Sequence, residues 1–518
     1  MSDEHYIGVD LGTTGVKAGV VSTDGTVLTT VSRDVQLDTP APGRVEFDGE
    51  GYIALALDCI REARERAKVD ARSVRGIGVS SQGQTFVLLG ADDRPLRPAI
   101  SWLDVRAEAE ARELATQAAD FCGGHANAIA SGPKLLWLRR HEPGVMTRVR
   151  RVLLTPDHLI FTLTDEDGIV DTSLHFYIIR SSDPTSTVRF DAFSPDVDYS
   201  YDPATARSTA LYDRGAGGWL TTLLATCGLE RGMMCEVRAP GESAGTLLPQ
   251  VASRLGLTEK TLVAVGTNDQ SVGALGAGNV THGCTSVTLG TALAIIVTSE
   301  RELTVPEGIG TGDHPAGGGL HTLLAFAKTA GIVLRWFRDR FAPGMSYEEL
   351  FAELSRVPIG CEGVSCLPHF SGTATPGFNP SARGAFAGIN LSHTRAHLAR
   401  AIVESLTFTI RENLELLSPL VGGIPTVRVW GGGAKSDVWL QMIADATGVT
   451  VERVAAGEAA VLGAAELAMV AAGRFDSVAG ASRALYRAAG RFAPDASRRP
   501  QYDEAFERYR SLYERLYG

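Results

Sequence analysis

The sequence predicts an α/β protein made of two related domains. Its 518 residues are too many for one ordinary hydrophobic core, so two or more domains are expected. Short apolar strand patterns alternate along the chain with amphipathic helical patterns, which is typical of α/β domains. A strand, a Gly-Thr turn and a second strand occur near the N-terminus and again in the second half of the chain. We therefore expect an N-terminal domain at 1–255 and a C-terminal domain at 256–518.

The first strand–turn–strand unit is Ile7–Gly25, IGVDLGTTGVKAGVVSTDG. Apolar residues fill both predicted strands, and the turn Gly12–Gly15 is small and rich in hydroxyls. Such a turn can offer backbone N–H groups and hydroxyls to an anion, because glycine lets a ligand approach without a Cβ in the way. Asp10 immediately precedes the turn, and a carboxylate beside a phosphate site implies a cation such as Mg²⁺ between them. An ordinary glycine hairpin explains the stretch equally well.

The second unit is Thr285–Thr298, TSVTLGTALAIIVT. Its segment VTLGTAL at 287–293 repeats VDLGTTG at 9–15 in sequence and in expected shape. Two such units suggest two related domains, each with a phosphate-facing turn.

Other patterns place the remaining elements. Ile53, Leu57 and Ile60 share one face of a predicted helix whose opposite face is charged. Residues 181–217 have no clean period and are rich in Asp, Ser, Tyr and Pro, so they are expected to form an irregular excursion. Strands are expected at Val27–Val35, Ile77–Ser80, Phe86–Leu89, Leu262–Val265, Val427–Trp430 and Val449–Val454, and helices at Gly51–Lys68, Ser131–Arg140, Ser271–Ala277, Ala396–Leu417, Asp437–Gly448, Ala459–Ala472 and Glu504–Leu516.

Charge and composition exclude several classes of protein. The net charge is −11, which argues against a general nucleic-acid binder. Seven scattered cysteines without a CxxC pair indicate reduced thiols, not a disulfide framework or a zinc site. The acidic start lacks the features of a signal peptide, and the longest apolar run, Ala459–Gly473, carries Glu466 and is too short to span a bilayer. We therefore expect a cytoplasmic protein without a membrane or nucleic-acid partner.

A glycine triplet, Gly431–Gly433, lies between a predicted strand and a predicted helix. It could aim helix N–H groups at a phosphate or let an adenine ring pack on bare backbone. It matches neither the G-x4-GK[ST] loop nor G-x-G-x-x-G. A tight strand-to-helix connection is the alternative.

Asp269 follows a buried strand pattern in the sequence GTNDQ. A carboxylate at the end of an α/β strand commonly faces a cleft, where it can accept a proton from a hydroxyl nucleophile. It could equally be the N-cap of the following helix, and both roles can coexist.

Five polar or aromatic residues lie near strand ends: Gln82, Gln84, Trp102, Asp104 and Arg106. Amide, carboxylate and guanidinium groups beside an indole suit a polyol, which needs hydrogen bonds to its hydroxyls and a flat apolar face for its C–H side. The alternative is a surface Asp104–Arg106 pair with Trp102 in the core.

Together these segments resemble the FGGY carbohydrate kinases, and especially xylulokinases, of the actin/hexokinase/Hsp70 ATPase superfamily. The resemblance runs from Ile7 to about Ala472. Its motifs are GVDLGTTGVKAGVVSTDG, PLRPAISWLDVRA (95–107), PKLLWLRRHEP (133–143), VAVGTNDQSVGALGAG (263–278), SVTLGTA (286–292), GVSCLPHFSGTATPGFNPSARGAFAGINLSHTRAHLARAIVESLTF (363–408) and VWGGGAKSDVWLQMIADATGVTV (429–451).

The resemblance implies two RNase-H-like (actin-like ATPase) domains around a central cleft that holds ATP and sugar. The N-terminal domain would carry the sugar site and first phosphate loop, and the C-terminal domain the nucleotide site and the catalytic Asp. Asp10 would organise Mg²⁺, Thr13 and Thr14 would hold the γ-phosphate, and Asp269 would be the general base. ADP would be held by Gly290, Thr291, Gly331, Gly432, Gly433 and Ala434, and the sugar by Gln82, Gln84, Trp102, Asp104, Arg106, Asp269 and Gln270. The family also suggests a homodimer.

Three departures from the family pattern concern the sugar. Xylulokinases usually read Gln-Met-His-Gly where this chain has Gln82–Thr85, so Gln84 replaces the histidine. The usual D-x-S-D-A-S stretch lacks its second Asp in Asp171–Phe176, and the loop Gly372–Pro376 lacks the common Glu-Arg pair. These changes predict a shifted sugar pocket with intact phosphoryl-transfer machinery.

The sequence thus predicts ATP-dependent phosphorylation of a terminal hydroxyl of a small sugar, most of all a pentulose such as xylulose or a related ketose. The alternatives are a polyol kinase of the erythritol or glycerol type, and a non-metabolic actin/Hsp70-like ATPase switch. The polar set around Gln82 and Trp102 argues against the switch, which needs no acceptor site. Intact Asp10 and Asp269 argue against a kinase-like protein that has lost activity.

Overall fold

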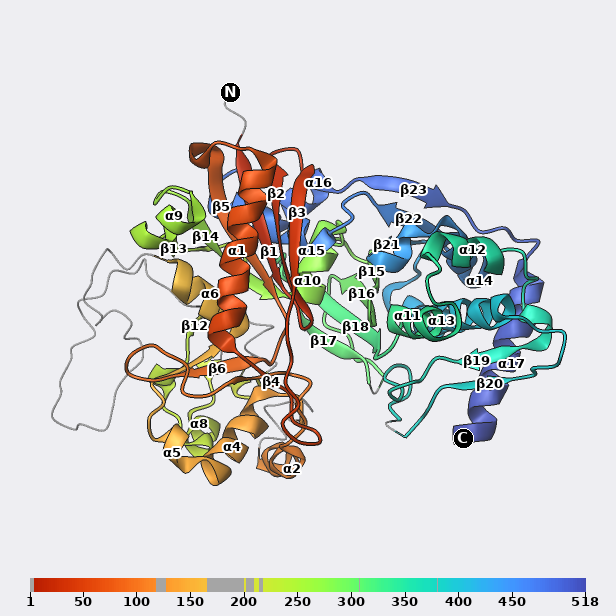
Figure 1. The fold of residues 1–518 in the computed structure, drawn as a ribbon, viewed down its shortest axis with the longest axis horizontal. Coiled ribbons are helices and arrows are strands. Elements are labelled where there is room, and N and C mark those ends of the chain that lie inside the picture. The colour runs from red at the N-terminus through yellow and green to blue at the C-terminus, as the bar shows by residue number, and fades with distance from the viewer. Residues whose placement is uncertain are drawn as a thin grey trace. The chain divides into compact units, whose positions relative to one another are not determined.

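The computed structural model describes residues 4–117, 127–164, 200–201, 209–213, 218–306, 308–379 and 381–518. The chain forms two compact units (Figure 1). Unit 1 comprises Met1–Gly276, Pro315–Gly317 and Ala460–Leu485, and unit 2 comprises Ala277–His314, Gly318–Ala459 and Tyr486–Gly518. The expected excursion at 181–217 lies mostly outside the described residues, and Asp171–Phe176 lies wholly outside them.

The division between the units falls after Gly276, whereas the sequence suggested a division after residue 255. The reason is the strand β14 (Leu262–Asn268), which pairs in parallel with β5 (Val74–Ser81) and so belongs to the first sheet. The helix α10 (Asp269–Gly276) follows it directly. Asp269 therefore belongs to unit 1.

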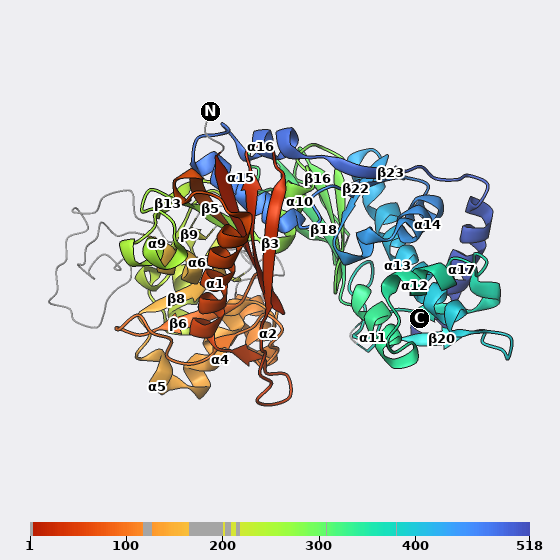
Figure 2. The same ribbon diagram turned by 45° about the horizontal axis from the view of Figure 1, so that its top comes forward.

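Unit 1 is built on a six-stranded sheet of order β13-β14-β5-β1-β2-β3. The hairpin of β1 (His5–Leu11) and β2 (Gly15–Ser22) is antiparallel, and β1 pairs in parallel with β5. The helix α1 (Gly49–Ala67) lies along one face of β2 and β3 (Figures 1 and 2). The apolar side chains of this face form one core with the inward side of α1. The expected first hairpin is confirmed.

The other face of this sheet receives α15 (Ala459–Ala471), which lies far away in sequence. Its backbone packs directly on glycines of β1 and β5. An ideal Cβ at Gly8 would lie 1.9 Å from the Val461 carbonyl oxygen, and one at Gly78 would lie 1.8 Å from the Ala464 carbonyl oxygen. Only residues without a Cβ allow this approach.

Unit 2 repeats the strand arrangement of unit 1. Its seven-stranded sheet has the order β17-β18-β16-β15-β21-β22-β23. The antiparallel hairpin of β15 (Thr285–Leu289) and β16 (Leu293–Ser299) corresponds to β1 and β2, and β15 then pairs in parallel with β21 (Thr426–Trp430) as β1 does with β5. This shared order confirms the predicted α/β class with two related domains.

The remaining elements follow the expected alternation. In unit 1 they are β3 (Val27–Asp34), β4 (Glu46–Phe47), β6 (Phe86–Leu89), β7 (Ala99–Ile100), α2 (Glu108–Gln117), α4 (Ser131–His141), α5 (Pro143–Met146), β8 (Arg151–Leu154), α6 (Thr155–Leu163), β9 (Ser200–Tyr201), β10 (Tyr212–Asp213), β11 (Gly218–Trp219), α8 (Thr221–Cys227), β12 (Glu236–Val237), β13 (Ser243–Thr246), α9 (Pro249–Leu255) and α16 (Val478–Leu485). In unit 2 they are β17 (Gly310–Asp313), β18 (His321–Ala327), α11 (Gly331–Phe341), α12 (Tyr347–Leu354), β19 (Ser365–Leu367), β20 (Ala385–Ala387), α13 (Arg395–Leu417), the short 3₁₀ turn η7 (Gly432–Lys435), α14 (Asp437–Thr447), β22 (Thr450–Val454), β23 (Ala488–Phe492) and α17 (Arg499–Tyr517).

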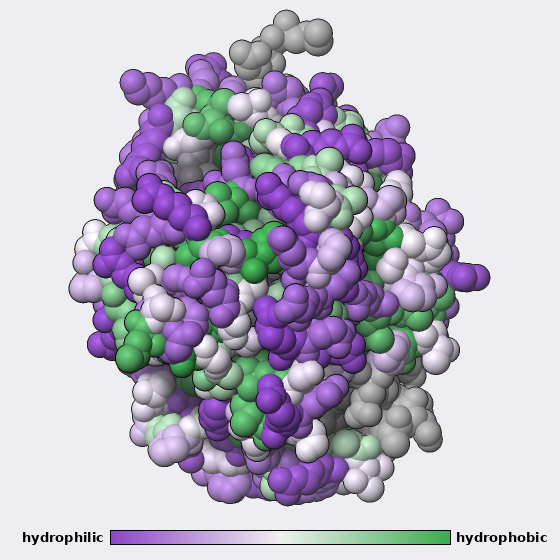
Figure 3. Space-filling model, turned by 90° about the vertical axis from the view of Figure 1, so that its right-hand side faces the viewer, coloured by the Kyte–Doolittle hydropathy of each residue, from purple (hydrophilic) through white to green (hydrophobic). Residues whose placement is uncertain are grey.

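The hydropathy of the surface and the state of the cysteines indicate no particular binding partner among the described residues. The face shown in Figure 3 is mostly hydrophilic, with apolar residues scattered among polar ones, and single exposed apolar residues of this kind need no partner. Within the described ranges, no helix combines the length and the apolar character needed to cross a membrane. The six described cysteines carry free thiols.

Glu466 is an exception inside the apolar helix α15. Its side chain is fully buried, and among the described residues neither carboxylate oxygen has a hydrogen-bond partner. Burial raises the pKa of Glu466 well above its usual value, so the native state favours the protonated form.

We expect Glu466→Gln to stabilise the protein at pH 8 and to do so less at pH 5. In the wild-type protein the unfolded state releases the Glu466 proton near pH 4.3, whereas the native state retains it to higher pH, so stability falls as pH rises between the two pKa values, by about 1.4 kcal/mol per pH unit. The glutamine removes this dependence. Melting temperatures at pH 5, 6, 7 and 8 provide the measurement, with the exposed Glu514→Gln as the matched control. A constant difference across this range would contradict the assignment.

Candidate active site

In unit 1 the β1–β2 turn forms a closed backbone loop. The Gly12 N–H donates to the Gly15 carbonyl over 3.0 Å, and Thr14 is exposed at the tip. Asp10 lies just before this turn at the end of β1, half-buried, where it accepts a 2.8 Å hydrogen bond from the Ser80 hydroxyl. The turn therefore presents small residues beside one held carboxylate, as an anion and cation site requires. We call residues 12–15 the phosphate hairpin.

Asp269 is half-buried and begins α10 at the end of β14. It lies within electrostatic range of Asp10. Its Oδ1 accepts a 2.8 Å bond from the Gln270 N–H, which also reaches Asn268 Oδ1 over 3.1 Å. Burial raises the pKa of Asp269 to about 7, and the negative charge of Asp10 adds to the shift, while the bond from Gln270 opposes it. A carboxylate with this pKa is suited to accept a proton near neutral pH.

Gln82 and Trp102 are tied to the phosphate hairpin. The Trp102 indole Nε1–H donates to Thr13 Oγ1 over 2.7 Å, and the backbone N–H of Gln82 donates to the Leu11 carbonyl over 2.9 Å. The Gln82 side chain is buried, and Trp102 is half-buried. The structure therefore brings both residues next to the hairpin, although Trp102 lies 89 positions from Thr13 in sequence.

Asp104 and Arg106 form a buried pair, not a surface pair. Asp104 Oδ1 accepts from the Arg106 N–H and Nε at 3.0 and 2.8 Å, while Oδ2 accepts from Val45 N and Arg106 Nη2 at 2.7 and 2.6 Å. Burial alone would raise the pKa of Asp104, but these bonds hold it below its usual value. Arg106 also reaches Glu46 Oε1 at 2.5 Å. Both Asp104 oxygens are thus used by the protein, and a sugar-binding role for this pair stays a prediction.

Gln84 and Gln270 complete the predicted sugar set in unit 1. Gln84 has a positive φ of 57°, which a residue with a Cβ adopts rarely, and its carbonyl accepts a 3.1 Å bond from the Ser131 hydroxyl. A strained non-glycine residue in a loop that also carries Gln82 is a feature often found at binding sites. Gln270 is half-buried beside Asp269.

The predicted nucleotide residues come together in unit 2. The Gly331 N–H donates to the Gly290 carbonyl over 2.9 Å, and the Ala330 N–H donates to the Thr291 carbonyl over 2.9 Å, so the start of α11 is bound to the β15–β16 turn. The glycine triplet packs against the same strand, because a Cβ at Gly433 would lie 2.8 Å from Leu289 Cβ. Thr291 and Gly432 are exposed. Sequence positions 290, 331 and 432–434 thus form one loop cluster, in which Gly432 is exposed and Ala434 is buried.

Two structural residues of this site were not predicted from the sequence. Tyr52 on α1 donates its hydroxyl to the Gly12 carbonyl over 2.9 Å and accepts from Gln82 Nε2 over 3.2 Å. Lys134 on α4 is fully buried and donates to the carbonyls of Ser101 and Ile129, both at 2.8 Å. Burial lowers the pKa of Lys134 to about 7. In the sequence Tyr52 could not be distinguished from an ordinary buried residue of an amphipathic helix, since no local pattern shows the partner of its hydroxyl.

Metal-binding groups are sparse. The ranges that the structure describes contain no cluster of three or more His, Cys, Asp or Glu side chains that could hold a metal ion. A cation at Asp10 would therefore have to take most of its ligands from phosphate oxygens and water, which is how Mg²⁺ usually binds beside a nucleotide. The single held carboxylate at the phosphate hairpin fits such an ion.

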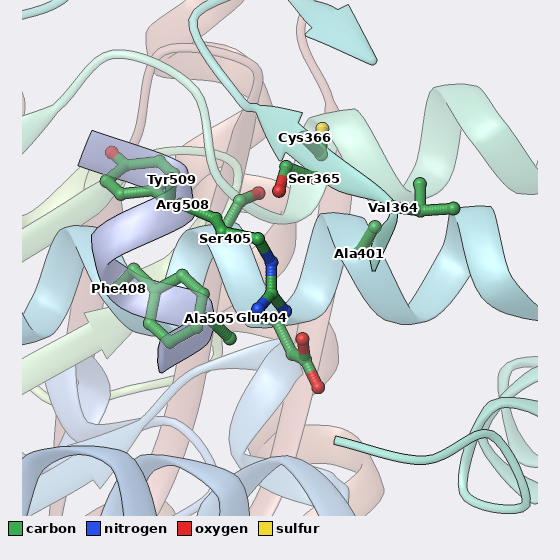
Figure 4. A pocket seen from close by; sticks show the side chains of 10 residues that line it. All are labelled: Val364, Ser365, Cys366, Ala401, Glu404, Ser405, Phe408, Ala505, Arg508 and Tyr509. Carbon is green, nitrogen blue, oxygen red and sulfur yellow. The ribbon is translucent and has the colours of Figure 1, made fainter. Parts of the chain in front are cut away.

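A separate small pocket lies in unit 2 between α13, α17 and β19 (Figure 4). Its lining includes Glu404, Arg508 and Tyr509. Glu404 is already bonded to Arg400 Nε over 2.7 Å and to the Gly360 N–H over 3.2 Å. None of the predicted site residues lines this pocket, so we assign it to packing.

Comparison with known proteins identifies the family. The model of the N-terminal domain of the FGGY family of carbohydrate kinases matches residues 5–175 and 196–276, and the model of its C-terminal domain matches residues 285–472. The chain belongs to the FGGY family of carbohydrate kinases. It is accordingly an ATP-dependent carbohydrate kinase, as the resemblance implied.

Relatives cover nearly the whole chain. A xylulose kinase of Bacillus subtilis is 30% identical over 98% of this chain and 97% of its own length. An autoinducer-2 kinase of Salmonella choleraesuis is 28% identical over 98% of this chain and 94% of its own length. The crystal structure of a xylulose kinase from Rhodospirillum rubrum has a TM-score of 0.80, with 26% identity and 99% of both chains covered. The similarity to the Rhodospirillum rubrum structure confirms the fold expected from the sequence.

Proposed function

We propose that this FGGY kinase transfers the γ-phosphoryl group of ATP to a terminal hydroxyl of a pentulose, with D-xylulose as the first candidate. Similarity to xylulose kinases along nearly the full chain supports the substrate class. The observation that carries the proposal is the position of Asp269 in unit 1, where the charge of Asp10 acts on it and Asp10 itself precedes the phosphate hairpin.

In this proposal Asp269 removes the proton from the sugar hydroxyl as its oxygen attacks the γ-phosphorus. The bond between that phosphorus and the bridging oxygen breaks, and ADP leaves. Thr13 and Thr14 hold the transferred group, and Asp10 would hold a Mg²⁺ ion, which would supply neutralisation of the phosphate charge. Gln82, Gln84, Trp102 and Gln270 orient the sugar, and positioning supplies much of the rate.

The nucleotide is held, in the same proposal, by the loop cluster of unit 2 that contains Gly290, Thr291, Gly331 and Gly432–Ala434. The open backbone at Gly432 supports this, because an ideal Cβ there meets no atom within 4 Å. A side chain added at Gly432 would therefore obstruct a bound nucleotide without disturbing the packing of the protein.

We expect Gly432→Leu to raise the KM for ATP about tenfold, a loss of about 1.4 kcal/mol, without lowering the melting temperature. The side chain obstructs only a bound ligand. The matched control is Gly457→Leu, since Gly457 is also exposed, lies in the same unit and has equally open surroundings, with no atom within 4 Å of an ideal Cβ. Equal KM values for ATP in the two variants would remove Gly432 from the nucleotide site.

The substrate is tested with an ADP-release assay over pentuloses, hexuloses, aldoses and polyols. D-xylulose is expected to give the highest kcat/KM. A preference for erythritol or glycerol would instead support the polyol alternative. Because Gln84 stands where xylulokinases usually have histidine, Gln84→His belongs in the same screen, and an unchanged order of substrates would exclude Gln84 from selectivity.

A further inference from the structure

A closed hydrogen-bond circuit joins the phosphate hairpin to the loop that carries Gln82. The Tyr52 hydroxyl donates to the Gly12 carbonyl and accepts from Gln82 Nε2, at 2.9 and 3.2 Å. Gln82 Oε1 accepts from the Thr85 hydroxyl at 3.2 Å. Thr85 Oγ1 then accepts from the Trp102 backbone N–H at 3.0 Å, and the Trp102 indole donates to Thr13 at 2.7 Å. Because residues 12 and 13 are neighbours in the chain, the circuit is closed.

The chemistry of the groups fixes the direction of every bond. The Gly12 carbonyl can only accept, so the Tyr52 hydrogen goes to it, and Tyr52 must then accept from the amide nitrogen of Gln82. This leaves the amide oxygen of Gln82 for Thr85, whose hydroxyl also lies 3.3 Å from the Gly83 carbonyl. At the other end, the indole N–H can only donate. The hydroxyl hydrogen of Thr13 is consequently directed away from Trp102 and can be donated to an anion.

Because these residues are buried, the directions of their hydrogen bonds persist. Tyr52, Gln82 and Thr85 are 2%, 3% and 0% exposed, so water does not compete for their bonds. The ring of Tyr52 is additionally fixed against Phe47, with ring centroids 4.9 Å apart. The Tyr52 hydroxyl lies within electrostatic range of Asp10 and Asp269, the two carboxylates of the site.

We propose that Tyr52 and Thr85 are positioning residues that couple the loop at Gln82–Thr85 to the phosphate hairpin. This inference rests on the proposed function for the roles of Gln82 and Thr13. A sugar that engages Gln82 sets the position of Tyr52 and Thr85, and these in turn fix the Gly12 carbonyl and the Thr13 hydroxyl that face the transferred phosphoryl group. Acceptor binding and phosphoryl alignment are thereby linked inside unit 1.

The test uses Tyr52→Phe and Thr85→Val, which remove one hydroxyl each and keep the side-chain volume. Each is expected to lower kcat for D-xylulose about tenfold, the loss of about one hydrogen bond, and Tyr52→Phe should also raise the KM for ATP several-fold because the γ-phosphate engages the Thr13 hydroxyl. The circuit acts as a unit. The double variant should therefore lose no more kcat than the less active of the two single variants. Thr85→Ser, which keeps the hydroxyl, should restore wild-type kcat.

Tyr509→Phe is the matched control. Tyr509 is also buried, and its hydroxyl donates to Glu412 over 3.2 Å, but it lies in unit 2 outside the circuit. It should change the melting temperature only. Three results would each overturn the proposal. Tyr52→Phe could keep wild-type kcat, Tyr509→Phe could lose as much kcat as Tyr52→Phe, or the double variant could lose kcat additively, by about a hundredfold.

A second measurement, of nucleotide binding, requires no sugar substrate. Tyr52→Phe should weaken binding of a non-hydrolysable ATP analogue several-fold more than binding of ADP, because only the former engages the Thr13 hydroxyl through its γ-phosphate. An unchanged ratio of the two Kd values would contradict the circuit. If the wild-type protein phosphorylates none of the sugars, the proposed function fails, while this nucleotide ratio still decides whether the circuit orders the phosphate hairpin.

Discussion

Asp269→Asn is expected to lower kcat for sugar phosphorylation by about 10²–10⁴-fold, the usual contribution of a general base. The asparagine keeps the size of the side chain and can still accept the bond from the Gln270 N–H, but it cannot take a proton from the attacking hydroxyl. The affinity for ATP should stay near the wild-type value, since Asp269 is not among the residues proposed to hold the nucleotide. Steady-state kinetics with saturating sugar, together with nucleotide titration, provide the measurement.

Asp48→Asn is the matched control for this prediction. Asp48 is exposed and is the N-cap of α1, where its side chain accepts from the Glu50 N–H, and asparagine caps helices equally well. This variant should keep wild-type kcat. If Asp269→Asn retained more than a tenth of the activity, Asp269 would not be the base.

Gly78→Ala is expected to destabilise unit 1 strongly, by about 3 kcal/mol or more. The added Cβ would lie 1.8 Å from the Ala464 carbonyl oxygen, so either β5 or α15 must move, and neither is a flexible side chain. Urea unfolding monitored by circular dichroism would measure the loss as a lower midpoint with an unchanged slope.

The same strand offers a graded control in Gly76→Ala. At Gly76 an ideal Cβ would lie 3.3 Å from Ala468 Cβ and from the Ala468 carbonyl, a tight contact that a shift of a few tenths of an ångström relieves. Its cost should be well below that of Gly78→Ala. Similar midpoints for the two variants would show that α15 does not pack on β5 as closely as described.

Much of the fold could be predicted because its signals are local. Apolar alternation around 12–15 and 290–291 was sufficient to place both hairpins, and Phe86–Leu89 and Asp437–Gly448 were placed within a residue of the observed elements. The elements β17, β18, α11 and α12 were not predicted, although α11 buries Val333, Leu334 and Phe337 at helical spacing and Ser346 caps α12.

The residues of the candidate site could likewise be predicted only where their signals are local. Asp10, Thr13 and Asp269 could be singled out because each stands at a turn or strand end that is visible in the sequence. The sequence did not show that Asp104 and Arg106 satisfy each other inside the protein, because the third partner, Val45, lies 59 positions away. It also did not show Tyr52, whose two hydrogen-bond partners lie 40 and 30 positions away.

The sequence by itself determined that this protein has two glycine-threonine hairpins, a carboxylate at the end of a strand and the character of an FGGY kinase. Each of these depends on residue types at short spacing, where backbone geometry leaves few alternatives. Only the tertiary structure decided which unit holds Asp269, how α15 packs on Gly8 and Gly78, and how a buried circuit through Tyr52 orients Thr13. These depend on contacts between segments 30 to several hundred residues apart, which are fixed by packing and hydrogen-bond satisfaction and not by any local pattern.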